Sequence, residues 1–278
     1  MTANRPQATI DSGAPALDVP PKRVLKMVRA QRPIVTVIVV LMTVWQVTTN
    51  FLPDIVAPPL TDIADSVVTI LTDWSLAQQL LYTAARVLFA LTVAFIGGLV
   101  LGIAMGISKR FSEYARSLLY LLQGVPALSW VVFAVIWFSN LELRIAFILV
   151  IVTLPQFALY VDAAVRSVDS KLLEVARSFR ASPIQRFRMI IVPAIVPSIL
   201  SAWSVNLGNG IRVAMVAELV GATSGVGFQL LRSQSIYDMS GAIAWTLLLV
   251  CYLLLLQGIL ALIEAKLLNW RAGESQNV

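Results

Sequence analysis

Six long apolar stretches divide the chain, and they decide what it can fold into. They are Ile34–Phe51, Leu80–Ile107, Leu118–Phe138, Leu141–Val161, Ala194–Val220 and Ala242–Ile263. The shortest has 18 residues, which in an α-helix cover about 27 Å, close to the roughly 30 Å of a bilayer's hydrocarbon core. Because backbone groups inside lipid must satisfy one another, such stretches span as helices. The pattern predicts an all-α, polytopic membrane bundle of six transmembrane helices.

Composition excludes a soluble enzyme. Apolar residues make up 58% of the 278 residues and charged residues only 13%, against about 45–50% and 25% in ordinary soluble domains. The chain has no histidine and one cysteine, Cys251, so an imidazole base, an internal disulfide and a zinc cluster are excluded. None of the five lysines follows a glycine, so the loop that binds ATP phosphates is missing. We therefore expect no catalytic residue, no metal and no cofactor.

The basic residues set the predicted orientation. Seventeen of the 21 lie in the N-terminal segment, the second-to-third and fourth-to-fifth connections, and the C-terminus, and such an excess marks the cytoplasmic side. Both termini are therefore expected in the cytoplasm, with residues 1–33 as an N-terminal tail, 34–270 as the membrane domain and 271–278 as a C-terminal tail. The net charge of +6 then reflects topology and contact with membrane lipid, and no nucleic acid partner is expected.

Two connecting segments are expected to form short helices at the outer surface. The first, Leu52–Gln79, has four aspartates, no Lys or Arg, and apolar residues at helical spacing, with Trp74 at headgroup level. The second is Ser224–Met239. Within the spans, Pro126 and Pro155 are expected to kink or break their helices, because proline removes a helical hydrogen bond.

Small residues four apart form one face of the second stretch. They are Ala90, Ala94, Gly98, Gly102 and Gly106. Without large side chains on this face, another backbone can approach closely. Two interpretations stay open, namely packing within the chain or a contact that moves as the protein changes state.

The cytoplasmic connection Arg166–Val192 is much longer than the usual helix–helix turn of about 2–8 residues. Two apolar stripes at helical spacing run along it, Leu172, Val175, Ala176 and Phe179, and then Ile184, Phe187, Ile190 and Ile191. Between them, Ser182-Pro183-Ile184-Gln185 has the residues of a capped helix start, and Pro193 is expected to stop or kink the second helix. The pattern predicts two short amphipathic helices that either dock to a partner or pack on themselves as an interfacial hairpin.

The ordered motifs of the chain resemble those of bacterial ABC importer permeases. Glu174-Val175-Ala176, followed by Arg180 and by Ile190-Ile191-Val192-Pro193, is similar to that family's coupling motif, E-A-A–x3–G–x9–I-x-L-P. A closer likeness, to the permeases of the nitrate, sulfonate, taurine and bicarbonate uptake group, rests on several shorter stretches. They are Phe51–Pro53, Ala85–Leu88, Val125–Leu128, Ile136–Phe138, Val165–Asp169, Val216–Leu219 and Ser224–Gly227.

The resemblance implies a type I ABC importer-like permease in the bacterial inner membrane, paired with a second copy of itself. ABC ATPase subunits would dock at residues 166–193, the coupling loop, and hydrolyse the ATP, while an extracytoplasmic solute-binding protein would deliver a small anionic organic or inorganic solute. The residues that it assigns to ATPase coupling are Glu174, Val175, Ala176, Arg177, Arg180, Ile190 and Pro193. A stand-alone secondary transporter or channel is the alternative, against which the long loop argues.

The coupling motif departs from the family pattern at two positions. Val175 replaces an alanine, which is a mild change, whereas Arg180 replaces the glycine. Glycine at a helix end permits a left-handed conformation that costs another residue about 1–2 kcal/mol. We expect the turn to be displaced toward Ala181; otherwise Arg180 bears the strain and contacts an acidic residue of the ATPase.

Polar residues within the spans are the candidates for the translocation pathway. They are Arg86, Asn206, Asn209, Arg212 and Glu218. An arginine in the middle of a membrane costs about 2.5–3.5 kcal/mol on insertion scales, so it usually faces the interior with a partner. Arg212 therefore either attracts an anionic solute or is neutralised within the bundle, and both interpretations stay open. Glu218 is expected to be a gate or pairing residue, because it would repel an anion.

Overall fold

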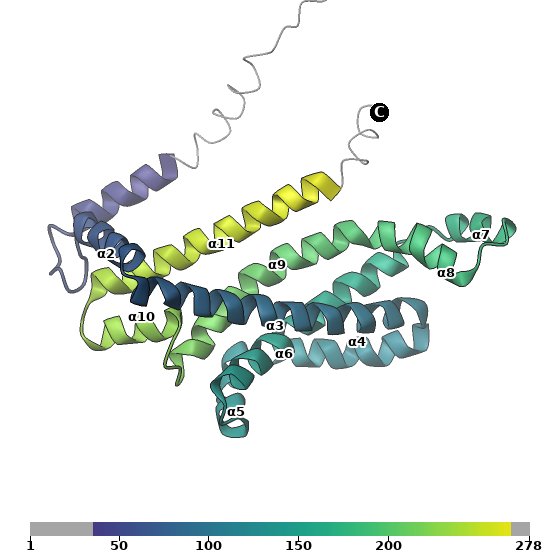
Figure 1. The fold of residues 1–278 in the computed structure, drawn as a ribbon, viewed down its shortest axis with the longest axis horizontal. Coiled ribbons are helices and arrows are strands. Elements are labelled where there is room, and N and C mark those ends of the chain that lie inside the picture. Colours follow the sequence, from purple (N-terminus) through teal and green to yellow (C-terminus); the bar gives the residue numbers. More distant parts are fainter. Residues whose placement is uncertain (1–35, 268–278) are drawn as a thin grey trace, which may run out of the picture. The chain divides into compact units, whose positions relative to one another are not determined.

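The computed structural model describes residues 36–267, apart from the side chains of Ser170, Leu173 and Arg177, and every regular element in this part is helical (Figure 1). The chain divides into two compact units, residues 1–51 and 52–278. In the first unit, the described part of the predicted first span contains one apolar helix, Thr36–Thr48. The predicted tails, residues 1–33 and 271–278, lie outside the described residues.

In the second unit, four helical segments are long and apolar enough to cross a membrane. They are α3 (Trp74–Ile107), α6 (Leu141–Arg166), the segment Pro183–Leu219 that ends in α9 (Val192–Leu219), and α11 (Met239–Leu267). A fifth is present if α4 (Lys109–Gly124) and α5 (Ala127–Trp137) count as one span with a bend of 90°. The described residues thus confirm the all-helical membrane fold and contain four or five of the predicted spans.

The two prolines expected to disturb the spans differ in their effect. Pro126 lies at the break between α4 and α5, where it precedes the first residue of α5. Proline is compatible with this position, because the residue just before a helix donates no N–H to a hydrogen bond within that helix. Pro155 lies inside α6, which continues from Leu141 to Arg166, so no break occurs there.

The small-residue face of α3 packs against α6. A Cβ atom added to Gly98 would lie 2.5 Å from the Cβ of Phe157, and one added to Gly102 would lie 2.5 Å from the carbonyl oxygen of Ala158. Both distances are too short for any side chain, so only glycine allows these two helices to approach so closely. The first interpretation, packing within the chain, is confirmed.

The two predicted surface helices are present as α2 (Leu60–Thr72) and α10 (Val226–Ser235), and both pack against α11. We call this end of the second unit the α10 end (Figure 1). Between α2 and α3, the Asp73 carboxylate accepts hydrogen bonds from the Ser75 hydroxyl at 2.7 Å and the Ser75 N–H at 2.8 Å. These bonds lower the pKa of Asp73. Because Asp73 caps the helix, α3 begins at Trp74, earlier than the predicted stretch at Leu80.

The coupling loop forms short helices at the opposite end, which we call the α7 end (Figure 1). These are α7 (Ser170–Ser178), α8 (Pro183–Arg186) and a π-helical turn, η1 (Phe187–Ile191). The predicted capping box is confirmed: the Ser182 hydroxyl accepts from the Gln185 N–H at 3.2 Å, and Gln185 Oε1 accepts from the Ser182 N–H at 2.8 Å.

Pro193 does not stop the second helix of the coupling loop, so the predicted stop was wrong, whereas a kink at this residue stays a prediction. It lies in the first turn of α9, and one helical segment continues from Pro183 to Leu219. The π-helical turn precedes this proline, and the Val192 N–H bonds to the carbonyl of Phe187. A proline in a first turn is tolerated because that turn needs fewer N–H donors.

The predicted displacement of the turn after α7 was also wrong. Arg180 itself has the left-handed conformation, with φ of 54°. The Ala181 N–H donates to the carbonyl of Ala176 at 3.0 Å, which is the bond expected when a left-handed residue closes a helix. Arg180 therefore occupies the conformation of the motif's glycine and bears its cost, as the second interpretation expected, while its contact with the ATPase stays a prediction.

Candidate functional site

An open face of α9 carries polar side chains in an otherwise apolar span. Ser201, Val205 and Arg212 are exposed and Asn209 is half-buried, and their spacing of three or four residues places them on one face of the helix. The guanidinium of Arg212 makes no hydrogen bond or ion pair with any other described residue. This rules out neutralisation of Arg212 by a carboxylate or carbonyl within the described part of the chain.

Asn209 also lines a cavity of about 370 Å³ at the break between α4 and α5. Gln123 and Gln156 line the same cavity, and Oε1 of Gln156 is buried without a hydrogen-bond partner among the described residues. Sequence reasoning missed both glutamines, although each lies inside an apolar stretch near a proline. Three amides thus supply neutral donors and acceptors to a cavity within the membrane-spanning region.

Asn206 does not share this open face. Its side chain is fully buried, and Nδ2 donates to the carbonyl of Ala202 at 2.9 Å. Its Oδ1 has no partner in the described part of the chain. The structure therefore separates Asn206 from Asn209 and Arg212, with which the sequence grouped it.

At the α10 end, Arg86 joins three helices through two carboxylates. Its Nη1 donates to Glu218 on α9 at 2.8 Å, while Nε and Nη2 donate to the two oxygens of Glu142 on α6 at 2.9 and 2.7 Å. Arg86 also donates to the carbonyl and hydroxyl oxygens of Ser224 at 2.8 Å. The forked guanidinium matches this geometry, which a lysine would not reproduce.

Glu218 is fully buried within this cluster and closely surrounded by donors. It accepts from the Thr83 hydroxyl at 2.8 Å and from the Gly227 N–H at 3.0 Å, in addition to Arg86. Gly225 has φ of 105°, and a Cβ there would lie 2.3 Å from Glu218 Oε1. These contacts fix the connection between α9 and α10, and they favour a structural role for Glu218 over contact with a solute.

At the α7 end, a second cluster is centred on Asp162, which sequence reasoning missed. This carboxylate is fully buried on α6 and accepts from Arg116 and, at 2.8 Å, from Nε of Arg166. Arg166 also donates to the carbonyl of Met105 on α3 at 2.7 Å. A buried carboxylate within a helix needs hydrogen-bond or charge partners. The sequence could have indicated this cluster, because Asp162 follows an apolar stretch and has an arginine, Arg166, four residues later.

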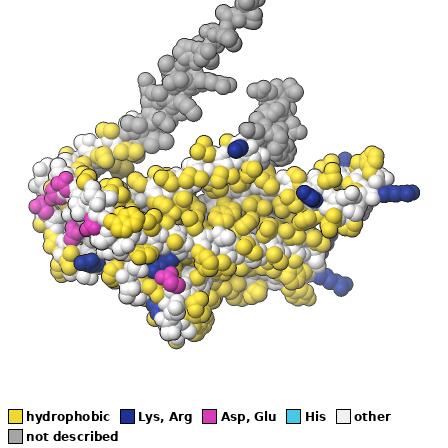
Figure 2. Space-filling view, in the orientation of Figure 1, with side chains coloured by type: hydrophobic (Ala, Val, Ile, Leu, Met, Phe, Trp, Pro, Cys, Tyr) yellow, Lys and Arg dark blue, Asp and Glu magenta, His cyan; other side chains and the backbone are white. Residues whose placement is uncertain are grey.

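The two clusters are separated by about the thickness of a bilayer core. Glu142 and Asp162 are 20 residues apart on the same helix, which corresponds to about 30 Å. On the face that Figure 2 shows, hydrophobic side chains cover most of the surface between the ends, basic side chains lie at both ends, and acidic side chains lie toward the α10 end. The charged clusters therefore lie where the polar boundaries of a membrane are expected.

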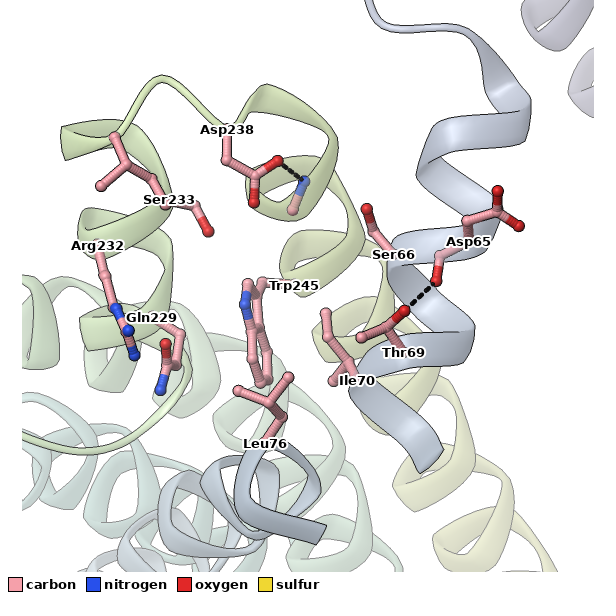
Figure 3. A pocket seen from close by; sticks show the side chains of 12 residues that line it. Asp65, Ser66, Thr69, Ile70, Leu76, Gln229, Arg232, Ser233, Asp238 and Trp245 are labelled. Carbon is pink, nitrogen blue, oxygen red and sulfur yellow. Dashed lines mark hydrogen bonds between the residues drawn. The ribbon is translucent and has the colours of Figure 1, made fainter. Parts of the chain in front are cut away.

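A further cavity of about 350 Å³ lies at the α10 end between α2, α10 and α11. Figure 3 shows Gln229 and Arg232 on one side, Asp65 on the other and Trp245 between them. The side chains of Gln229 and Ser233 are only 6% and 7% exposed, and neither makes a hydrogen bond with another described residue. The cavity therefore presents unused donors and acceptors to whatever enters it.

The coupling loop exposes large apolar side chains. Phe179, Ile184 and Met189 are 82%, 77% and 74% exposed, and Val175 is exposed as well. Among the other predicted coupling residues, Glu174, Arg180 and Pro193 are exposed, whereas Ala176 and Ile190 are half-buried. The side chain of Arg177 lies outside the described part. Such a concentration of apolar surface at a polar end is typical of a protein-binding site.

Comparison with known proteins shows which family the chain resembles. Residues 98–269, more than half of the chain, match the family described as binding-protein-dependent transport system inner membrane component. The taurine transport system permease protein TauC of Escherichia coli is 28% identical over 244 residues, covering 85% of this chain and 88% of TauC.

One further relative and one solved structure are similar to this chain. A putative aliphatic sulfonates transport permease protein, SsuC of Bacillus subtilis, is 33% identical over 176 residues, covering 63% of each chain. A chain from the inward-facing MetNI methionine ABC transporter has a similar fold, with a TM-score of 0.60 at 18% identity, covering 70% of this chain and 99% of that one.

Proposed function

The chain belongs to the family of binding-protein-dependent transport system inner membrane components, and on this premise we propose how it forms a solute pathway. It is an inner-membrane, multi-pass permease component of an ABC importer, homologous to taurine and sulfonate permeases. Such a component is not the ATPase, which is a separate subunit. We further propose six spans in a type I arrangement, with both termini and the α7 end in the cytoplasm, as the distribution of basic residues favours.

One observation carries the proposal for the pathway. Arg212 is exposed on an apolar span and has no partner among the described residues. An arginine that faced lipid there would cost about 2.5–3.5 kcal/mol, so water or another protein covers this face of α9. We propose that the open face lines the pathway and that a second copy of the chain completes it.

The chemistry of this face favours an anionic group on the solute. Arg212 supplies a positive charge, and the amides of Asn209, Gln123 and Gln156 supply donors without the cost of further charges. Relatives that are permeases for taurine and for aliphatic sulfonates favour a sulfonate as that group. Arg86 and Glu218 border the pathway at its outer end, and the buried Asn206 supports it from behind.

The coupling loop is proposed as the docking site for an ABC ATPase. Phe179, Ile184 and Met189 would enter an apolar groove of that subunit, while the exposed Glu174 would pair with a basic residue at its rim. At the opposite end, the cavity that contains Gln229 and Arg232 offers polar groups on the side where a solute-binding protein would release its solute.

Uptake by the reconstituted transporter tests the pathway. Arg212→Gln, in proteoliposomes with the ATPase and binding protein, should abolish uptake of a sulfonate while the complex still assembles and hydrolyses ATP. Lys266→Gln, a loss of charge near the end of α11, should leave uptake unchanged. Wild-type-like uptake by Arg212→Gln would refute the proposed pathway, and uptake driven by an ion gradient without ATP would indicate the alternative, a secondary transporter.

A further inference from the structure

A third cavity, of about 320 Å³, lies at the α7 end, and three of its five lining residues are basic. Its walls come from the first turns of α4 and the end of α6, and they consist of Lys109, Ser112, Glu113, Arg116 and Arg166. The permease function uses none of these residues. Lys109 is exposed, and its ammonium makes no hydrogen bond or ion pair with any other described residue.

The charges around this cavity are not balanced. Asp162 is the carboxylate that holds both Arg116 and Arg166, so two guanidinium groups share one negative charge. Lys109 adds a second surplus positive charge and Glu113 removes one, which leaves the cluster with a net charge of +1.

Unused hydrogen-bond donors remain as well. Arg166 uses Nε and Nη2, and Arg116 uses Nη2, while their other N–H groups have no partner in the described part of the chain. The ammonium of Lys109 is likewise unused. Because α4 begins at Lys109, the partial positive charge of its first turn adds to the same region. The arrangement suits an anion with several acceptor oxygens.

The position of the cavity identifies the kind of anion. Asp162 lies about 30 Å along α6 from Glu142, so the cavity lies at one boundary of the hydrocarbon core. By the distribution of basic residues, this boundary is the cytoplasmic one. Basic pockets between helices on the cytoplasmic side are suited to lipid headgroups, and anionic lipids are concentrated there.

We propose that this cavity binds the phosphate of an anionic phospholipid from the cytoplasmic leaflet. Lys109 and the unused N–H groups of Arg116 and Arg166 would hold the phosphate oxygens, while the acyl chains would lie along the apolar surface of the bundle. The inference rests on the orientation given under the proposed function, but not on the identity of the solute.

Lipid binding to the purified transporter tests the proposal directly. In detergent, the thermal unfolding midpoint should rise when phosphatidylglycerol is added and should not rise with phosphatidylcholine. Native mass spectrometry should show retained phosphatidylglycerol, and Lys109→Gln should weaken its binding about fivefold, the effect of one basic residue near a lipid surface. Lys266→Gln is the matched control, because it removes a charge outside the cavity and should bind as wild type.

Two further measurements keep the outcome decisive. Glu113→Gln removes a negative charge from the cavity and should strengthen binding of phosphatidylglycerol. If Lys109→Gln weakened binding only because it misfolds, this gain in Glu113→Gln would not be expected. Equal binding by Lys109→Gln and Lys266→Gln would overturn the proposal. Displacement of the lipid effect by millimolar inorganic phosphate would show a free anion site instead and would also overturn it. Neither failure would affect ATP-driven uptake, so the proposed function would stand.

Discussion

Arg86 and Glu218 are 132 residues apart in the sequence, yet Nη1 of Arg86 lies 2.8 Å from Oε1 of Glu218. The two side chains are 7% and 0% exposed, so this ion pair is buried. Its position decides how α3, α6 and α9 meet at the α10 end, because Arg86 also binds Glu142 on α6. The pair therefore fixes the geometry of the helices that border the open face of α9.

Glu218→Gln should lower the free energy of unfolding by about 3–5 kcal/mol, because one partner of a buried ion pair is removed and Arg86 loses half of its compensation. Glu142→Gln removes the other carboxylate, whose side chain is 62% exposed, and should cost about 1 kcal/mol or less. Thermal or denaturant unfolding in detergent measures both. An equal loss in the two variants would contradict the structural role assigned to Glu218.

Gly225→Ala tests the same cluster from the backbone. With φ of 105° and a Cβ 2.3 Å from Glu218 Oε1, alanine should strain the backbone by about 1–3 kcal/mol and displace the carboxylate as well. Gly258→Ala is the control, because a Cβ there meets nothing within 4 Å. The unfolding midpoint should fall for the first variant and stay the same or rise slightly for the second. A fall of the same size in both would show that the cluster tolerates the added atom.

The sequence predicted the spans and the coupling loop well because the signals for both are local. A run of apolar residues of bilayer length identifies a span by itself, and the capping box at Ser182 and Gln185 depends on neighbours in the chain. The start of α3 was placed too late because the cap at Asp73 lies in a polar segment. The predicted stop at Pro193 was wrong because proline is common both in the first turn of a helix and just after its end.

The contacts of the candidate site could not be predicted in the same way. Which carboxylate meets Arg86, or which arginines meet Asp162, depends on helices far apart in the sequence. The sequence could raise Arg212 as a pathway candidate, but only the packing shows that no described residue neutralises it. Gln156 and Asn209 line one cavity because the helix breaks between α4 and α5 at Pro126. No local sequence pattern predicts that cavity.

Glu174→Lys should uncouple ATP hydrolysis from uptake. Glu174 is exposed on α7 beside the apolar surface of the coupling loop, so reversing its charge should weaken docking of the ATPase without disturbing the fold. The ratio of solute taken up to ATP hydrolysed, measured in proteoliposomes, should fall severalfold. Glu264→Lys near the end of α11 is the control for the change of charge. Normal solute-stimulated hydrolysis and uptake in Glu174→Lys would argue against docking at this residue.

Arg180→Gly should stabilise the turn between α7 and α8. Arg180 has φ of 54°, a conformation that costs an ordinary residue about 1–2 kcal/mol and that glycine adopts freely. Local opening, followed by hydrogen exchange at the Ala181 N–H that bonds to Ala176, should become rarer by about tenfold. Arg180→Val should have the converse effect, because a β-branched side chain tolerates the left-handed region poorly. Hydrogen exchange at the Ala181 N–H should therefore be faster in Arg180→Val than in the wild type. If both variants assemble with the ATPase and the coupling ratio changes in both, the guanidinium itself contacts the ATPase; an unchanged ratio in Arg180→Gly would show that the position serves the turn alone.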